Sequence, residues 1–317
     1  MKHDDETKPE LSIVIPVYNE EDNVSLLHRS LKEVLDKLNM GYEMIYVDDG
    51  STDNTPKNLK SLRQKDKDVK VIIFRRNFGQ TAAMDAGFKS ALGRIIIAMD
   101  ADLQNDPKDI PALLEKINEG YDCVSGWRAD RKDPFSKRAF SKIAGIIRNV
   151  IARDGIHDSG CSLKAYRKEC FENLDLYGEM HRFIPALLKI QGFKITEIKV
   201  KHNPRLHGKS KYNILRVLKG FLDLLVVKFW MAYSTRPIHL FGGAGLLIFF
   251  VGFIGGVYLS VLKFLYNASI GSRPLLILSA LCMMIGFQFF MFGLLADIMV
   301  KDYYKEKKPY SIKEILK

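Results

Sequence analysis

The stretch Ile95-Ile96-Ile97-Ala98-Met99-Asp100-Ala101-Asp102-Leu103-Gln104 decides which fold this chain is expected to adopt. Residues 95–99 form an apolar run that is too short for a helix and is typical of a buried strand. Asp100 and Asp102 stand at its C-terminal end on the same side, because strand side chains alternate. Two carboxylates beside the amide of Gln104 are hard oxygen ligands. They predict a site for Mg²⁺ or Mn²⁺ that phosphate oxygens complete.

Strands and helices alternate on either side of this stretch. Strands are expected at residues 11–16, 42–47, 69–74, 94–99 and 122–125, and helices at residues 22–38, after Thr52 or Asp53, and up to residue 91. Another helix is expected to start at Asp106, as N-cap, and Pro107. This order predicts an α/β fold with a doubly wound, mostly parallel sheet. Right-handed crossovers then bring the C-terminal ends of the strands to one edge.

That edge is expected to gather polar side chains from several strand ends. Tyr18 and Glu20 follow the first strand, and Asp48 and Asp49 follow the second. Tyr18 offers a stacking face, while Glu20 and Asp49 are acceptors for a base edge or ribose hydroxyls, so the cleft is expected to hold a nucleoside diphosphate. The alternatives are that Tyr18 packs under a helix and that Asp48 and Asp49 belong to a turn before Gly50. A dinucleotide-binding glycine motif and a Walker lysine loop are absent from the sequence.

Basic side chains continue this chemistry further along the chain. Arg128 and Arg131 follow the fifth strand and are within reach of phosphate. Residues 135–151 have a basic amphipathic pattern that predicts a helix on the membrane surface, with a soluble helix as the alternative. The basic loop at residues 205–212 is expected to close over a phosphate through Arg205, Lys209 and Lys211. Attraction of this loop to anionic lipid is its alternative.

The composition favours a membrane over nucleic acid as the partner. The formal net charge of the 317 residues is +11, and the four cysteines lack the paired spacing of a disulfide framework or zinc site. Residues 240–262 and 275–296 are apolar, contain no charged residue, and as helices span roughly 33 Å, enough to cross a bilayer core of about 30 Å. We therefore expect two transmembrane helices, and no nucleic-acid partner.

Charges that flank these helices predict the topology. Basic residues precede the first and follow the second, whereas the loop between them has only Lys263 and Arg273, so both termini and the catalytic domain are expected in the cytoplasm. Gly252 and Gly256 have the spacing that packs helices or protomers, and ordinary glycine use is the alternative. A homo-oligomer is one expected outcome. The expected parts are a cytoplasmic catalytic domain (1–210), an amphipathic juxtamembrane segment (211–236), two transmembrane helices (237–300) and a basic cytoplasmic tail (301–317).

Together these segments resemble the family 2 glycosyltransferases of the GT-A fold, and within them the polyprenyl-phosphate glycosyltransferases. That group includes dolichol-phosphate mannose synthases and bacterial undecaprenyl-phosphate aminoarabinose transferases, and the motifs are most similar to the latter. The matching pieces are PVYNEE at 16–21, DDGS at 48–51, RNFGQ at 76–80, DADLQ at 100–104, GCSLKAYR at 160–167, RFIP at 182–185 and GKSKY at 208–212. The ordered set covers nearly the whole chain.

The resemblance implies roles for individual residues. The nucleoside would be held by Pro16, Tyr18, Glu20, Val47 and Asp49, and the nucleotide contacted by Asp100 and Ala101. The metal would be bound by Asp102 and Gln104 with Asp100, and the donor phosphates by Arg128, Arg205 and Lys211. The lipid phosphate would be met by Arg131, Arg138 and Ser141. Some relatives have an acid where this chain has Cys161, and Asp158 lies three residues earlier, which leaves the identity of any general base open.

The expected activity is an inverting transfer of a sugar from a nucleotide-diphosphate sugar to undecaprenyl or dolichyl phosphate at the cytoplasmic membrane face. A uridine donor is expected over a guanosine one. A phosphate acceptor is already anionic, so metal and arginines that stabilise the leaving diphosphate matter more than a strong base. One alternative is a glycosyltransferase that acts on a polysaccharide or another lipid, although Gln-x-x-Arg-Trp is absent. Another is an inactive nucleotide-sugar binding protein, which the intact Asp100, Asp102 and Gln104 disfavour.

Overall fold

The computed structural model describes residues 9–129, 155–176, 178–204 and 236–306, together with residues 229 and 233. The chain divides into two compact units, Met1–Lys228 and Phe229–Lys317. The first unit contains a β-sheet, and the second contains two long apolar helices. The expected basic helix at residues 135–151 and the basic loop at residues 205–212 lie outside the described residues.

The first unit is built on one seven-stranded sheet with the order β3-β2-β1-β4-β6-β5-β7. The strands are β1 (Leu11–Val17), β2 (Tyr42–Asp48), β3 (Val69–Ile73), β4 (Ile95–Ala98), β5 (Cys123–Trp127), β6 (Lys164–Arg167) and β7 (Ile195–Lys199). Neighbouring strands are parallel, except that β6 runs antiparallel to both β4 and β5. The expected α/β fold with a mostly parallel sheet is confirmed.

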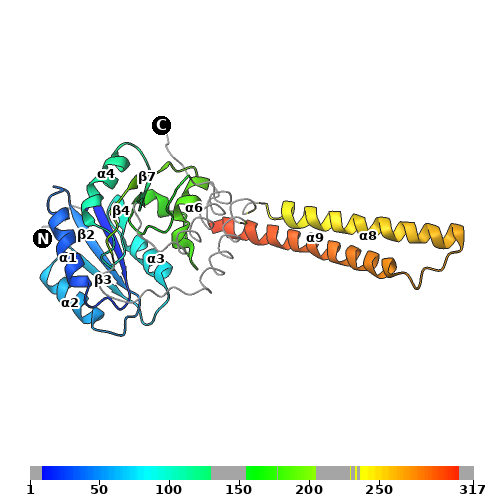
Figure 1. Ribbon diagram of the computed structural model, residues 1–317, viewed down its shortest axis with the longest axis horizontal. Helices are drawn as coiled ribbons and strands as arrows, with labels where there is room; N and C mark the ends of the chain where they lie inside the picture. The colour runs from blue at the N-terminus through cyan, green and yellow to red at the C-terminus, as the bar shows by residue number, and fades with distance from the viewer. Residues whose placement is uncertain are drawn as a thin grey trace. The chain divides into compact units, whose positions relative to one another are not determined.

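Helices cover both faces of this sheet, with α1 and α2 on one side and α3 on the other (Figure 1). The helices are α1 (Val24–Leu35), α2 (Thr55–Lys65), α3 (Gln80–Ser90), α4 (Ile110–Asn118) and α6 (Ile184–Ile190). In β1, Ile13 and Ile15 belong to the cluster under α1, while Val14 belongs to the cluster under α3, because side chains alternate along a strand. The strands β1, β2 and β4 are therefore buried on both faces, which is why they are largely apolar in the sequence.

Two helix starts test the capping predictions. Asp106 accepts a hydrogen bond at 3.0 Å from the backbone N–H of Lys108 and so caps the 3₁₀ turn Pro107–Asp109, which leads into α4. The residue before α2 is Asn54, whose side chain makes no capping hydrogen bond. Asp53, one of the two predicted capping residues, accepts the backbone N–H of Thr55 through its Oδ1 at 3.0 Å, so its side chain caps the start of the helix from one position earlier.

The second unit contains two helices that are long and apolar enough to cross a membrane. They are α8 (Ile238–Tyr266) and α9 (Pro274–Glu306). Each has a 29-residue span, Ile238–Tyr266 and Pro274–Asp302, in which a stretch of 18 residues has a mean hydropathy of 2.3. Only 17% of the apolar stretch in α8 and 11% of the one in α9 are buried, so most of these side chains face outward, as side chains in contact with lipid do. The two predicted apolar helices are confirmed, and their length, composition and exposure are those of membrane-spanning helices.

Glycines let α8 and α9 pack closely. A Cβ added to Gly245 would lie 2.6 Å from the carbonyl oxygen of Gly286, and one added to Gly252 would lie 2.6 Å from the carbonyl oxygen of Ser279. A Cβ on Gly256 meets only the flexible end of Met283, at 3.9 Å. Within the predicted pair, Gly252 therefore serves packing inside one chain, where small residues let backbones approach.

Alanine substitutions at two helical glycines should have opposite effects on stability. Gly286→Ala places a Cβ 2.4 Å from the backbone nitrogen of Phe249, an overpacking expected to cost about 1–3 kcal/mol. Gly243→Ala is the matched control, since a Cβ there has no described atom within 4 Å and alanine favours a helix over glycine by about 1 kcal/mol. Thermal unfolding in detergent should show a lower Tm only for Gly286→Ala. An equal or higher Tm for that variant would contradict the packing.

Candidate functional site

Three neighbouring strands, β2, β1 and β4, end at one edge of the sheet. Val17 in β1 pairs with Asp48 in β2, and Val14 in β1 pairs with Ala98 in β4. The chain leaves all three parallel strands at the same side, so the segments that carry Tyr18 and Glu20, Asp49, and Asp100 and Asp102 meet there. This is the edge where open α/β sheets bind ligands.

Asp49 ties two loops of this edge together. It is 3% exposed, and its two oxygens accept the backbone N–H groups of Phe78 at 2.7 Å and Gly79 at 2.9 Å. Asp48 stabilises the turn that follows β2, because its Oδ1 accepts a hydrogen bond from the backbone N–H of Ser51 at 3.2 Å. Gly50 in the same turn has φ +69°, and a Cβ there would lie 2.3 Å from the carbonyl carbon of residue 76. The turn after β2 therefore packs directly on the loop after β3.

The other residues expected around a nucleoside differ in what they offer. Glu20 Oε2 accepts a hydrogen bond from Asn23 Nδ2 at 2.5 Å. Val47 is completely buried and Ala101 is 3% exposed, so neither side chain is open at the edge. Tyr18 is partly exposed, and Pro16 lies beside Val47 in the pairing of β1 with β2.

The two aspartates after β4 lie in a tight polar turn. Asp100 Oδ1 accepts a hydrogen bond from Gln80 Nε2 at 2.7 Å. Burial raises the pKa of the Asp100 carboxyl to about 6, and the charge of Asp102 adds to the rise. Asp102 is 7% exposed, and its Oδ1 accepts the backbone N–H of Gln104 at 3.2 Å. Leu103, which lies between Asp102 and Gln104, has φ +61°, a left-handed backbone conformation that is unfavourable for a residue with a side chain.

This donor set suits a hard divalent cation. Two adjacent carboxylates repel each other, as the raised pKa of Asp100 records, and a cation between them would relieve that repulsion. Within the described residues, no three or more His, Cys, Asp or Glu side chains gather into a cation site. The residues that would hold such a cation here are Asp100, Asp102 and the Gln104 amide, and the other ligands would come from bound phosphate, as is usual for Mg²⁺.

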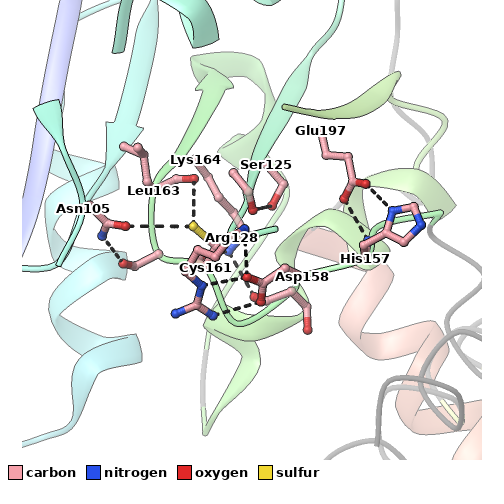
Figure 2. Close-up of polar contacts among 12 residues, drawn as sticks. Asn105, Ser125, Arg128, His157, Asp158, Cys161, Leu163, Lys164 and Glu197 are labelled. Carbon is pink, nitrogen blue, oxygen red and sulfur yellow. Dashed lines mark hydrogen bonds and ion pairs between the residues drawn. The ribbon is translucent and has the colours of Figure 1, made fainter. Parts of the chain in front are cut away.

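Arg128 and Asp158 form a bidentate ion pair at the end of β5 (Figure 2). Arg128 Nε donates to Asp158 Oδ2 at 2.7 Å, and Nη2 donates to Oδ1 at 2.9 Å. Their side chains are 11% and 12% exposed. Burial disfavours the charged guanidinium, but the hydrogen bonds to Asp158 outweigh it and raise the pKa of Arg128. With its pKa raised, Arg128 stays charged. The ion pair uses two of the five N–H groups of the guanidinium, which leaves other donors for a second anion.

Lys164 holds the turn that carries Asp158. Its side chain is buried at 3% exposure, burial lowers its pKa, and its Nζ donates to the carbonyl oxygens of Ser159, at 3.2 Å, and Cys161. Cys161 is completely buried, and burial raises the pKa of its thiol. Figure 2 shows this group around Cys161. Cys161 is thus a packed, neutral side chain in this turn.

Two further contacts brace the same turn. Asn105 Nδ2 donates to Ser162 Oγ at 2.7 Å, and the Ser162 hydroxyl also hydrogen-bonds Asp100, which joins the turn to the metal segment. On the other side, the His157 ring stacks on Trp127, with ring centroids 4.6 Å apart, and its Nδ1 contacts Glu197 of β7 (Figure 2). Asp158 is therefore fixed by its neighbours on both sides.

Four of these residues were missed by the sequence analysis: Gln80, Asn105, Ser162 and Lys164. Three of them stand in quoted motifs, Gln80 in RNFGQ and both Ser162 and Lys164 in GCSLKAYR, but motif letters alone do not show which side chains meet. Six predicted site residues lie outside the described part of the chain: Arg131, Arg138, Ser141, Arg205, Lys209 and Lys211.

Comparison with known proteins places these motifs in one family. The family model for "Glycosyl transferase family 2" matches residues 12–175. The dodecaprenyl-phosphate galacturonate synthase of Rhizobium johnstonii is 40% identical over 302 residues, which cover 94% of this chain and 89% of that protein. The undecaprenyl-phosphate 4-deoxy-4-formamido-L-arabinose transferase of Proteus mirabilis is 37% identical over 296 residues, 92% of this chain and 89% of that protein.

Solved structures agree with the fold. The glucosyl-3-phosphoglycerate synthase of Mycobacterium tuberculosis, in a crystal with Mn²⁺, UDP and glucosyl-3-phosphoglycerate, has a TM-score of 0.53 to this chain at 14% identity. The likeness covers 70% of this chain and 80% of that one. It is a likeness of fold alone, and it confirms the GT-A fold expected from the sequence.

Proposed function

Since the chain belongs to the glycosyl transferase family 2, we propose that it transfers a sugar from a nucleoside diphosphate sugar to polyprenyl phosphate at a membrane. The observation that carries the proposal is the convergence of Asp100 and Asp102 with an arginine, Arg128, at the edge where β1, β2 and β4 end. The acceptor is supported by the two polyprenyl-phosphate transferases that match over more than nine tenths of the chain.

The proposed reaction is a single displacement at the anomeric carbon. An oxygen of the lipid phosphate attacks that carbon, the bond from the carbon to the diphosphate breaks, and the nucleoside diphosphate leaves, so the anomeric configuration inverts. Asp100, Asp102 and Gln104 would hold Mg²⁺ or Mn²⁺, which when bound supplies positive charge to the departing diphosphate. Arg128 adds charge-assisted donors to the same phosphates, with Arg205 and Lys211.

No side chain is required as a general base in this scheme. The acceptor oxygen of a phosphate monoester already carries negative charge near neutral pH. Asp158 accepts two hydrogen bonds from Arg128, so we assign it to orienting that guanidinium. The thiol of Cys161 is buried with a raised pKa, which disfavours it as a base. Arg131, Arg138 and Ser141 are proposed to meet the lipid phosphate.

The nucleoside is proposed to lie over Tyr18, Glu20 and Asp49, with backbone contacts from Pro16, Val47 and Ala101. Uridine is proposed over guanosine, and the support is that proteins of the same fold have been solved with UDP.

The arrangement in the membrane belongs to the same proposal. Residues 1–210, residues 211–236 and the tail at 301–317 are proposed to be cytoplasmic, on either side of two spans within residues 237–300. Basic residues before the first span and after the second support this sidedness. Self-association is proposed through α9, where Gln288 is exposed in the middle of the span, a costly place for a polar side chain facing lipid.

A substrate assay tests this proposal against its two alternatives. The purified full chain would be incubated in detergent with Mg²⁺ or Mn²⁺, undecaprenyl phosphate, and labelled UDP- and GDP-sugars that include UDP-galacturonate and UDP-4-formamido-arabinose. We expect one sugar to be transferred to undecaprenyl phosphate, and we expect no product to form when EDTA is present to remove the cation. Label in a polymer or another lipid would support the alternative that the enzyme glycosylates a polysaccharide or a different lipid. Binding of nucleotide-sugar without turnover would support the alternative of an inactive binding protein.

A further inference from the structure

Three consecutive residues, the last of which begins α3, contact two aspartates of the proposed site, Asp49 and Asp100. Phe78 and Gly79 donate their backbone N–H groups to the carboxylate of Asp49, at 2.7 and 2.9 Å. The next residue, Gln80, donates its side-chain Nε2 to Oδ1 of Asp100 at 2.7 Å. Because β1 separates β2 from β4 in the sheet, this short segment bridges two strand ends that are not neighbours.

The start of α3 is held in place from several sides. Gly79 has φ +97°, a conformation that favours glycine, while a Cβ there would have open space around it, so the requirement is on the backbone. Phe74 meets the Phe78 ring edge-on, with centroids 5.7 Å apart. On the far side of Gln80, Thr81 Oγ1 lies 2.6 Å from His181 Nδ1. The sequence analysis gave His181 no role, and here it anchors the first turn of α3.

We infer that Gln80 is a positioning residue for the metal site: its side-chain amide fixes the Asp100 carboxylate in the orientation in which the cation is bound. The inference rests on the proposed function. An amide is suited to this task because it donates a hydrogen bond without adding charge, whereas a lysine in its place would compete with the cation. Partners that orient a metal-binding carboxylate in this way typically contribute about 10–100-fold to metal affinity.

Direct measurement of Mn²⁺ binding tests this role without relying on turnover. Free Mn²⁺ would be followed by electron paramagnetic resonance during titration of the full chain in detergent with saturating UDP. Gln80→Ala is expected to weaken Mn²⁺ binding by about 10–100-fold. Gln80→Met, which keeps the volume but lacks the N–H donor, should do the same. Gln64→Ala, an exposed glutamine on α2, is the matched control and should bind Mn²⁺ as the unmodified chain does.

A double-variant cycle separates positioning from general damage. If Gln80 acts through Asp100, adding Gln80→Ala to Asp100→Ala should weaken Mn²⁺ binding no further. The inference is overturned if Gln80→Ala and Gln80→Met bind Mn²⁺ normally, or if the losses from Gln80→Ala and Asp100→Ala are additive. Absence of Mn²⁺ binding by the unmodified chain with UDP would instead overturn the proposed function itself, and this inference with it.

Discussion

Asp102→Ala is expected to lower the rate of sugar transfer by at least about 10²–10³-fold, the usual cost of removing one group that stabilises a developing charge. Asp102 is almost completely buried, two residues after Asp100, and its carboxylate accepts a hydrogen bond from the backbone N–H of Gln104. Its loss leaves the cation one carboxylate and one amide from the described chain. The departing diphosphate would then leave with its charge poorly neutralised. Initial rates at several Mn²⁺ concentrations measure the effect.

Asp106→Ala is the matched control for this variant. Asp106 lies four residues further along, where it caps the turn before α4 and has no place in the proposed site. Its loss should cost about 0.5–2 kcal/mol of stability and leave the transfer rate unchanged. Comparing the two variants therefore separates damage to folding from damage to the chemistry. Normal activity of a folded Asp102→Ala variant would refute the assignment of the metal site.

Arg128→Ala is expected to have the second-largest effect, a loss of about 10²–10³-fold in kcat/KM. It should also destabilise the protein by about 3 kcal/mol, because Asp158 would be left as a largely buried carboxylate without its partner. Arg128→Ala combined with Asp158→Ala removes both charges. That double variant should regain much of the stability and none of the activity. Rates and unfolding temperatures of the single and double variants measure both effects.

The pH profile of Asp158→Asn distinguishes the two possible roles of Asp158. An asparagine keeps one acceptor for the Arg128 guanidinium but does not titrate. If Asp158 orients Arg128, the variant should lose activity by a similar factor at every pH, and the shape of the profile should stay the same. If Asp158 were a general base, the fall in rate on the acidic side would disappear in the variant. That second outcome would contradict the role assigned to Asp158.

The sheet and its edge were predictable because parallel strands are buried on both faces and so appear as short apolar runs. Once the run at residues 95–99 is taken as a strand, the positions of Asp100 and Asp102 at its C-terminal end follow. The antiparallel insertion of β6 between β4 and β5 was not predicted. It is only four residues long, Lys164–Arg167, and nothing in so short a segment encodes which neighbours it pairs with.

The contacts that brace the site were beyond sequence reasoning for a different reason. Gln80 and Asp100 are 20 residues apart, and Asn105 and Ser162 are 57 apart, so their pairing depends on the whole fold. Lys164 is the sharpest case, because a lysine is normally expected at the surface. Here the carbonyl oxygens of its own turn satisfy the buried ammonium, a geometry that the sequence does not reveal.

The apolar helices were predicted in place, but both extend further at their C-terminal ends than the predicted apolar segments do. Residues 275–296 were expected to cross the membrane, whereas α9 runs from Pro274 to Glu306. Hydropathy marks only the part of a helix that is apolar, and a helix continues through polar residues until its backbone hydrogen bonding ends.

The central claim is that Asp100 and Asp102 hold a divalent cation against the diphosphate of the donor. Anomalous diffraction at the manganese edge, from crystals of the full chain grown with Mn²⁺ and UDP, tests it most directly. The account predicts one strong peak about 2.2 Å from an oxygen of each aspartate and in contact with both phosphates of UDP. A diphosphate bound without such a peak, or a peak remote from Asp100 and Asp102, would contradict it.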